Sequence, residues 1–385
     1  MEKNKKKKVI TVLKRVFLSL TVIILICAIP LIKPFGEDMS VFYKTFVGKK
    51  SSYQGMIEIW NIDTFESGNI SKTKLLTNIA NNYQKKNKGV YFMIRNVTEQ
   101  ECLNLLESGE CPDLFSCSYG VAEKIKNYVK PYSSSDFDIR QEFIDAGSFN
   151  GELYGLAWSR GCYFLISTKE KLQKAGAIID GEEKEFSLLE NALSLGYEIK
   201  NKNSTKIVYS LVFGNGKYLM PQVALNSYNN VGLGDNNFAL NSNNINQTQY
   251  TAYSKFVAGE AVVLLGSNRD VFRMENRVKN GKVSDVIYYP LSKFTDLVQF
   301  MFIGKNASEE KVETINDFAS FITGESTQKL LANFGMLPVN MADENNYNNG
   351  IMKDIIPEIN GDLTLYNVFL SESEITELRH KNLLE

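Results

Sequence analysis

The chain has 385 residues, 44% of them hydrophobic, and its formal net charge at pH 7 is −1. This length suffices for two domains of ordinary size, and a general nucleic-acid binder would carry a basic excess that this chain lacks. A single histidine, His380, nearly excludes Ser-His-Asp or Cys-His catalysis and excludes a histidine-rich site, so we expect neither an enzyme nor a bound metal or cofactor.

Residues 1–33 have the pattern of an export signal or membrane anchor. Basic residues between Lys3 and Arg15 precede an uncharged run from Val16 to Ile32, which as a helix would be ~25 Å long. This order is typical of a segment whose positive end stays in the cytoplasm. The sequence predicts that the rest of the chain lies outside the membrane.

Three fates of this segment stay open: retention as a transmembrane helix, lipidation at Cys27, or cleavage. Residues 34–53 have no clear period and read as a tether between membrane and domain. The tether and the abundance of Lys, Asn and Ile favour the extracellular face of the plasma membrane of a Gram-positive bacterium.

Strands and helices alternate through the next part of the chain. Ser71 is placed to cap one helix, and Thr98 with Glu101 forms a capping-box pattern at the start of another. The strands are expected over 56–61, 90–97 and 114–118, and the helices over 71–86, 98–106 and 120–129. This alternation predicts a parallel α/β sheet, whose ligands lie outside the carboxyl ends of the strands.

The loops at those strand ends contain the first candidate binding residues, which are Asp63, Thr64, Phe65 and Tyr119. Asp63 has an alternative role in capping the following helix, and Tyr119 has an alternative role in packing. Two other residues of this region, Cys102 and Cys111, are either bridged or free buried thiols.

Three segments resemble the extracellular solute-binding proteins, family 1, of bacterial ABC importers. Phe256–Asp270 has a Phe-x-x-Gly-x-Ala pattern before an apolar strand, and Phe318–Val339 ends in Gly-Met-Leu-Pro. Tyr154–Ser167 is similar to the crossover strand of that family, although Ala157 and Ser167 replace its usual proline and asparagine.

The resemblance implies a two-lobed, periplasmic-binding-protein-like fold of type II, with an α/β sandwich in each lobe and hinge crossovers between them. The implied division is 54–158 plus 261–302 for lobe one, 163–257 plus 306–370 for lobe two, and 371–385 for a C-terminal tail.

The resemblance also nominates binding residues near the crossovers: Trp158, Arg160, Tyr163, Arg269, Asp270 and Met336. Aromatic faces cover sugar rings, and arginine binds hydroxyls or an anionic group. Each residue has a structural alternative, such as hinge packing for Trp158 or an ion pair between lobes for Arg269.

The function implied is capture of a solute, most often a sugar or oligosaccharide, by closure of two lobes that then contact ABC permease subunits. A membrane-anchored sensor of the same fold is the alternative, and a glycosidase based on carboxylates alone is a third. The sequence shows no pair of carboxylates in a recognisable glycosidase setting.

Overall fold

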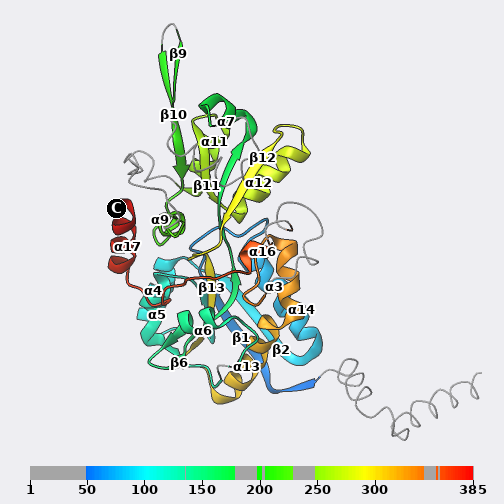
Figure 1. Cartoon of the computed structure of the whole chain (residues 1–385). Coiled ribbons are helices and arrows are strands. Elements are labelled where there is room, and N and C mark those ends of the chain that lie inside the picture. Colours follow the sequence, from blue (N-terminus) through cyan, green and yellow to red (C-terminus); the bar gives the residue numbers. More distant parts are fainter. Residues whose placement is uncertain are drawn as a thin grey trace, which may run out of the picture.

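The computed structural model describes residues 49–134, 136–177, 197–201, 204–228, 248–341, 353 and 356–384. They form two lobes, each built around one mixed sheet (Figure 1). The anchor predicted over 1–33 and most of the predicted tether lie outside these residues. Within the described ranges, no helix is long and apolar enough to cross a bilayer.

The first lobe contains a six-stranded sheet with the order β2-β1-β3-β13-β4, and β7 pairs with β13 beside this path. β1 is parallel to β2 and β3, whereas β13 is antiparallel to β3, β4 and β7. The strands are β1 (Lys49–Asn61), β2 (Asn87–Asn96), β3 (Leu114–Cys117), β4 (Val129–Lys130), β7 (Gly155–Arg160) and β13 (Val298–Gly304). The three expected strands are confirmed, and β1 begins inside the segment that we interpreted as a tether.

The helices of this lobe begin where their caps predict. The Ser71 hydroxyl accepts from the amide of Lys74 at 3.3 Å, and the Thr98 hydroxyl accepts from that of Glu101 at 3.2 Å. α3 packs against β1 and β2, and α13 packs against β1 and β7. The helices are α3 (Lys72–Lys86), α4 (Glu99–Glu107), α5 (Val121–Ile125), α6 (Gln141–Gly147), α13 (Glu309–Thr323) and α14 (Glu325–Leu331), with the short elements η3 (Lys126–Tyr128), β5 (Ser148–Phe149), β6 (Glu152–Leu153) and η5 (Ala332–Phe334).

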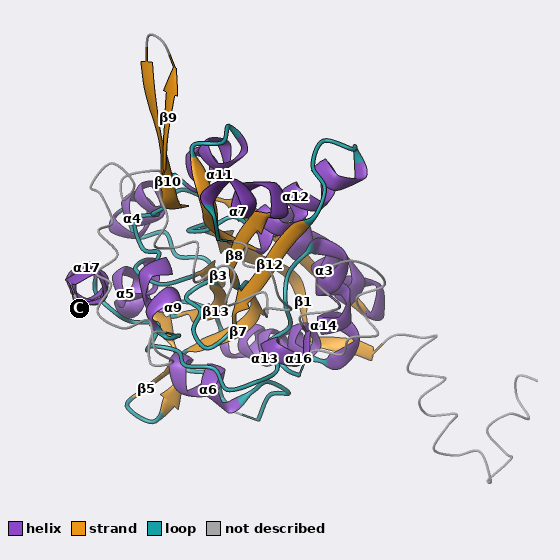
Figure 2. Cartoon of the chain, turned by 45° about the horizontal axis from the view of Figure 1, so that its top comes forward, coloured by secondary structure: helices purple, strands orange, loops and turns teal. Residues whose placement is uncertain are grey.

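The second lobe contains a five-stranded sheet with the order β12-β8-β11-β10-β9. β10 and β11 are parallel and the other pairs are antiparallel. Helices α7, α11 and α12 pack on this sheet, and the β9–β10 pair projects from its end (Figures 1 and 2). The elements are β8 (Tyr163–Thr168), α7 (Lys169–Ala175), β9 (Tyr197–Asn201), β10 (Ser204–Phe213), α9 (Pro221–Asn226), α11 (Gln249–Val257), β11 (Ala261–Ser267), α12 (Asn268–Lys279) and β12 (Val286–Leu291), followed late in the chain by α16 (Ile356–Ile359) and α17 (Glu372–Leu384).

Two parts of the expected lobe division are wrong. We expected 261–302 in lobe one, but β11 and β12 belong to the second sheet and only β13 joins the first. We expected 306–370 in lobe two, but α13 packs on strands of the first sheet. The run Val262–Leu265 is buried on both faces in its sheet, and an apolar run of this kind does not show which of two buried sheets it joins.

The crossover from the first sheet to the second lies at Gly161 and Cys162, between β7 and β8. The buried side chain of Gln328 holds this region to the C-terminal part of lobe one. Its Nε2 donates to the carbonyls of Trp158 at 2.9 Å and Ile322 at 2.7 Å, and its Oε1 accepts from the Val339 amide at 2.9 Å. One side chain therefore satisfies three backbone groups.

We expect Gln328→Leu to lower the free energy of unfolding by about 3 kcal/mol, because it leaves buried backbone groups without partners. Urea denaturation of the variant and the wild type measures this difference. Lys329→Met is the matched control, since Lys329 is the next residue and its side chain is 43% exposed. An equal effect of the two substitutions would contradict the role assigned to Gln328.

Candidate functional site

A chamber of about 510 Å³ lies between the two lobes, beside the loop that follows β1. The loop and the start of α3 line it from the first lobe, and the first turns of α11 and α12 line it from the second. The lining residues are Asp63, Thr64, Phe65, Glu66, Ser67, Asn69, Ile70, Ser71, Lys72, Gln249 and Arg269. Most of them carry hydroxyl, carboxylate, amide or cationic groups, so the chamber suits a polar ligand.

Asn61, the buried last residue of β1, organises the strand ends beneath the chamber. Its Nδ2 donates to Asp63 Oδ1 at 3.1 Å and to Asn96 Oδ1 at 3.0 Å, and its Oδ1 accepts from Ser116 Oγ at 3.0 Å. Asn96 ends β2 and Ser116 lies in β3. One amide therefore links three parallel strands at the edge where ligands of such sheets bind.

Lys72 is a buried cation in the chamber wall. Its ammonium donates to the Phe65 carbonyl, lies 3.5 Å from Asp63 Oδ1 and lies 3.5 Å from the centroid of the Phe65 ring. Burial lowers the pKa of Lys72 to about 8, and the neighbouring Asp63 carboxylate offsets part of this effect.

Arginines of α12 connect the second lobe to the same loop. Arg269 Nη1 donates to the Gly68 carbonyl at 2.6 Å, and Arg273 Nη2 lies 3.0 Å from Glu66 Oε2. Arg273 also pairs with Asp270 at 3.0 Å. The Arg269–Gly68 and Arg273–Glu66 contacts cross from one lobe to the other beside the chamber, whereas the Arg273–Asp270 pair lies within α12.

The chamber brings together four of the sequence-predicted residues: Asp63, Thr64, Phe65 and Arg269. The Phe65 ring is 5% exposed and has the Lys72 ammonium on its face, so it is not arranged as an open stacking surface. Asp63, Thr64 and Arg269 are the members whose polar groups suit hydroxyl recognition.

The other six predicted residues are buried outside the chamber lining, in contacts within the protein. The Tyr119 hydroxyl donates to the Tyr366 carbonyl at 2.9 Å, and Arg160 Nε donates to the Pro338 carbonyl at 2.9 Å. Asp270 Oδ2 accepts from the Ser267 amide at 3.0 Å in the capping box of α12.

Of the remaining three, Met336 Sδ accepts from the Gly68 amide at 3.4 Å. The Trp158 indole N–H is buried with no hydrogen-bond partner among the described residues. Tyr163 is buried next to Asp296, and its desolvation raises the pKa of the phenol. A ligand role for these six residues stays a prediction.

Lys72 and Gln249 belong to the chamber, and the sequence reasoning missed both. A signal existed for Lys72, because it occupies the first turn of α3, where the helix dipole disfavours a cation. Gln249 has no such signal, because its position opposite the β1 loop depends on how the lobes are arranged.

The chain matches no protein-family model and no curated protein. Its fold does match solved structures. The GacH receptor of Streptomyces glaucescens, solved unliganded and with acarbose, has 13% identity and a TM-score of 0.59 over 86% of this chain and 92% of that chain. The substrate-binding protein Lmo0181 from Listeria monocytogenes, solved with cycloalternan, has 15% identity and a TM-score of 0.55 over 86% and 95%.

The chain has the two-lobed fold of these solute-binding proteins. The same fold is matched in thiaminase I from Bacillus thiaminolyticus, with 13% identity and a TM-score of 0.54 over 86% of this chain and 100% of that chain. The fold is thus shared by binding proteins and an enzyme. The fold therefore does not decide between binding and catalysis, and that choice has to rest on the residues of the site.

We expect the stability contributed by Lys72 to increase with pH between about 8, its folded-state pKa, and its ordinary value of 10.5. In this window the unfolded chain binds a proton that the folded protein does not, so the free energy of unfolding rises with pH. Comparison of the wild type with Lys72→Met by urea denaturation at pH 7, 9 and 10.5 measures the effect.

The difference between the two proteins should change by about 3 kcal/mol across this window in favour of the wild type. Lys74→Met is the control, because Lys74 is exposed on the same helix. A difference that stays constant with pH would show that the Lys72 ammonium is not desolvated.

Proposed function

We propose that this protein is the solute-binding component of an ABC importer and that it captures a carbohydrate between its two lobes. The observation that carries the proposal is the polar chamber at the carboxyl end of β1, which both lobes line. Carboxylate, amide, hydroxyl and guanidinium groups are the partners that sugar hydroxyls use in proteins. Several solved proteins of the same fold are described as bound to saccharides, which supports this ligand class.

The chemistry of the described cysteines favours capture over catalysis by a thiol. Burial raises the pKa of Cys102 and of Cys162 to about 12, and it raises the pKa of Cys117 well above its ordinary value. The nucleophilic form of cysteine is the thiolate, which these environments disfavour. The carboxylates of the chamber are likewise engaged, Asp63 with Lys72 and Glu66 with Arg273.

The proposal includes a place at the extracellular face of the membrane, with permease subunits as partners. The basic and apolar pattern of residues 1–33 supports export and retention at the membrane. Release of a captured solute requires that the lobes separate, and the crossovers at Gly161 and before β13 are the segments about which they would rotate.

Thermal unfolding of the purified protein against a panel of neutral and acidic saccharides tests this function. A ligand that binds only the folded protein, at 100 times its Kd, adds about 2.7 kcal/mol to stability. We expect at least one saccharide to raise the unfolding midpoint. No change with any member of a broad panel would contradict carbohydrate capture.

For a saccharide that binds, we expect Asp63→Asn to weaken affinity about 10-fold or more, because the negative charge that strengthens a hydrogen bond from a sugar hydroxyl is lost. Isothermal titration calorimetry measures the two dissociation constants. Glu107→Gln is the matched control, since Glu107 is exposed on α4. Unchanged affinity in Asp63→Asn would place the binding site outside the chamber.

A further inference from the structure

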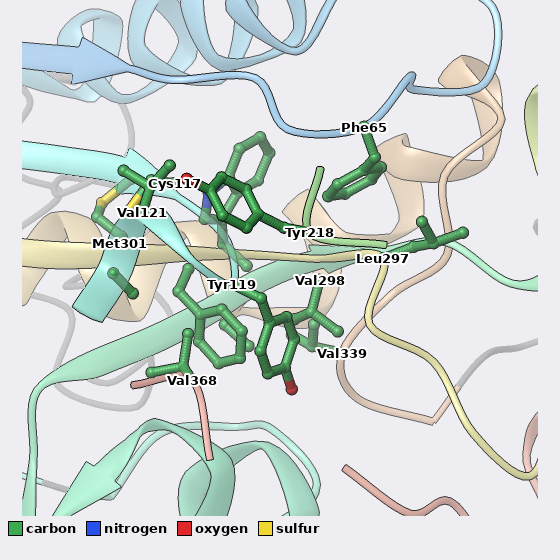
Figure 3. Packing of buried hydrophobic residues seen from close by; sticks show 14 of the residues in the cluster. Phe65, Cys117, Tyr119, Val121, Tyr218, Leu297, Val298, Met301, Val339 and Val368 are labelled. Atoms are coloured by element: carbon green, nitrogen blue, oxygen red, sulfur yellow. The ribbon is translucent and has the colours of Figure 1, made fainter. Parts of the chain in front are cut away.

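Tyr218, in the segment between β10 and α9 of the second lobe, reaches the carboxyl end of β3 in the first lobe. Gly120 lies just after β3 with a φ of 76°, and a Cβ atom built on it would lie 2.1 Å from Tyr218 Cδ1. The tyrosine ring therefore rests directly on the backbone of this loop, which only glycine permits. Figure 3 shows Tyr218 within the buried apolar cluster that also contains Tyr119, Val121 and Leu297.

A polar network of the first lobe holds the Tyr218 hydroxyl. It donates to Glu99 Oε1 at 2.7 Å and accepts from Lys124 Nζ at 3.0 Å. Lys217, the preceding residue, lies 3.1 Å from the same carboxylate oxygen. Burial favours the neutral acid, but the hydrogen bonds from Lys124, Tyr218 and Lys217 keep the pKa of Glu99 below its ordinary value.

The C-terminal helix α17 holds the same segment from the other side. Arg379 donates to the carbonyls of Leu219 and Lys217, each at 2.7 Å, and to that of Gly216. Glu372, at the start of α17, lies 3.6 Å from Lys124 Nζ and 3.4 Å from Lys217 Nζ. One helix therefore binds both the Tyr218 segment and the first-lobe lysine that contacts it.

The ends of β1 and β3 thus differ in what faces them. The end of β1 faces the chamber of about 510 Å³, and the end of β3 is covered by a side chain of the protein itself. A ligand at the end of β3 would have to displace Tyr218 from Gly120 and separate its hydroxyl from Glu99.

We propose that Tyr218, held by α17, closes the β3 side of the cleft and restricts the solute to one short enough for the chamber beside Asp63. The length restriction rests on the proposed carbohydrate capture, whereas the closure is a property of the protein without ligand. Tyr218 is therefore a specificity-determining residue, and α17 positions it.

Hydrogen exchange of the amides at 120–122 tests the closure without ligand. We expect Tyr218→Ala to speed their exchange at least 10-fold, and Arg379→Gln, which keeps the tyrosine, to speed it in the same direction. Tyr91→Ala is the matched control, because its side chain is 64% exposed on β2. Exchange that is equally slow in both test variants and the wild type overturns the closure.

Calorimetry with a ladder from monosaccharides to hexasaccharides tests the restriction. We expect the wild type to bind only the short members and Tyr218→Ala to gain at least 10-fold in affinity for longer ones, with the short ones unchanged. The same length preference in both proteins overturns the restriction. Binding of no saccharide by either protein overturns carbohydrate capture and with it the length restriction, and the exchange result then decides the closure alone.

Discussion

The arrangement of the lobes depends on the close approach of three chain segments at Gly161. The Gly161 amide donates to the Leu297 carbonyl at 2.6 Å, and a Cβ atom on Gly161 would lie 2.6 Å from Asn268 Oδ1 and 3.0 Å from Leu297 Cβ. Beside it, the Arg160 amide donates to the Leu337 carbonyl at 3.0 Å and the Leu337 amide donates back at 2.8 Å. Both crossovers and the C-terminal part of lobe one thus meet at one point, where a larger residue has no room.

This geometry brings the loops of the first lobe opposite α12 and the Tyr218 segment of the second. Contacts between lobes form on both sides of the cleft, through Arg269 and Arg273 at the β1 loop and through Tyr218 at the β3 loop. Between exposed partners such pairs contribute little, but several of these side chains are largely buried, which strengthens each contact. A solute that enters this cleft therefore competes with contacts that the protein makes with itself.

The candidate site shows which binding residues can be predicted from their position after a parallel strand and which cannot. Asp63 and Thr64 were predictable because they follow a parallel strand, and Asn61 holds Asp63 there through its side chain. Tyr119 also follows such a strand, yet its hydroxyl donates to the Tyr366 carbonyl, and Tyr218 covers the neighbouring Gly120. The strand-end rule identifies a loop, but it does not say which element of the other lobe lies opposite.

The sequence by itself determined the local elements of this protein, including the capped helices and the parallel strands near the start of lobe one, because these features depend on periodicity and capping within a few residues. The two-lobed fold was implied by the resemblance to solute-binding proteins. Only the tertiary structure decided that β11 and β12 join the second sheet, that Lys72 and Gln249 line the chamber and that Tyr218 reaches Gly120. Each of these contacts joins segments far apart in the chain, and its residues carry no local pattern that names the partner.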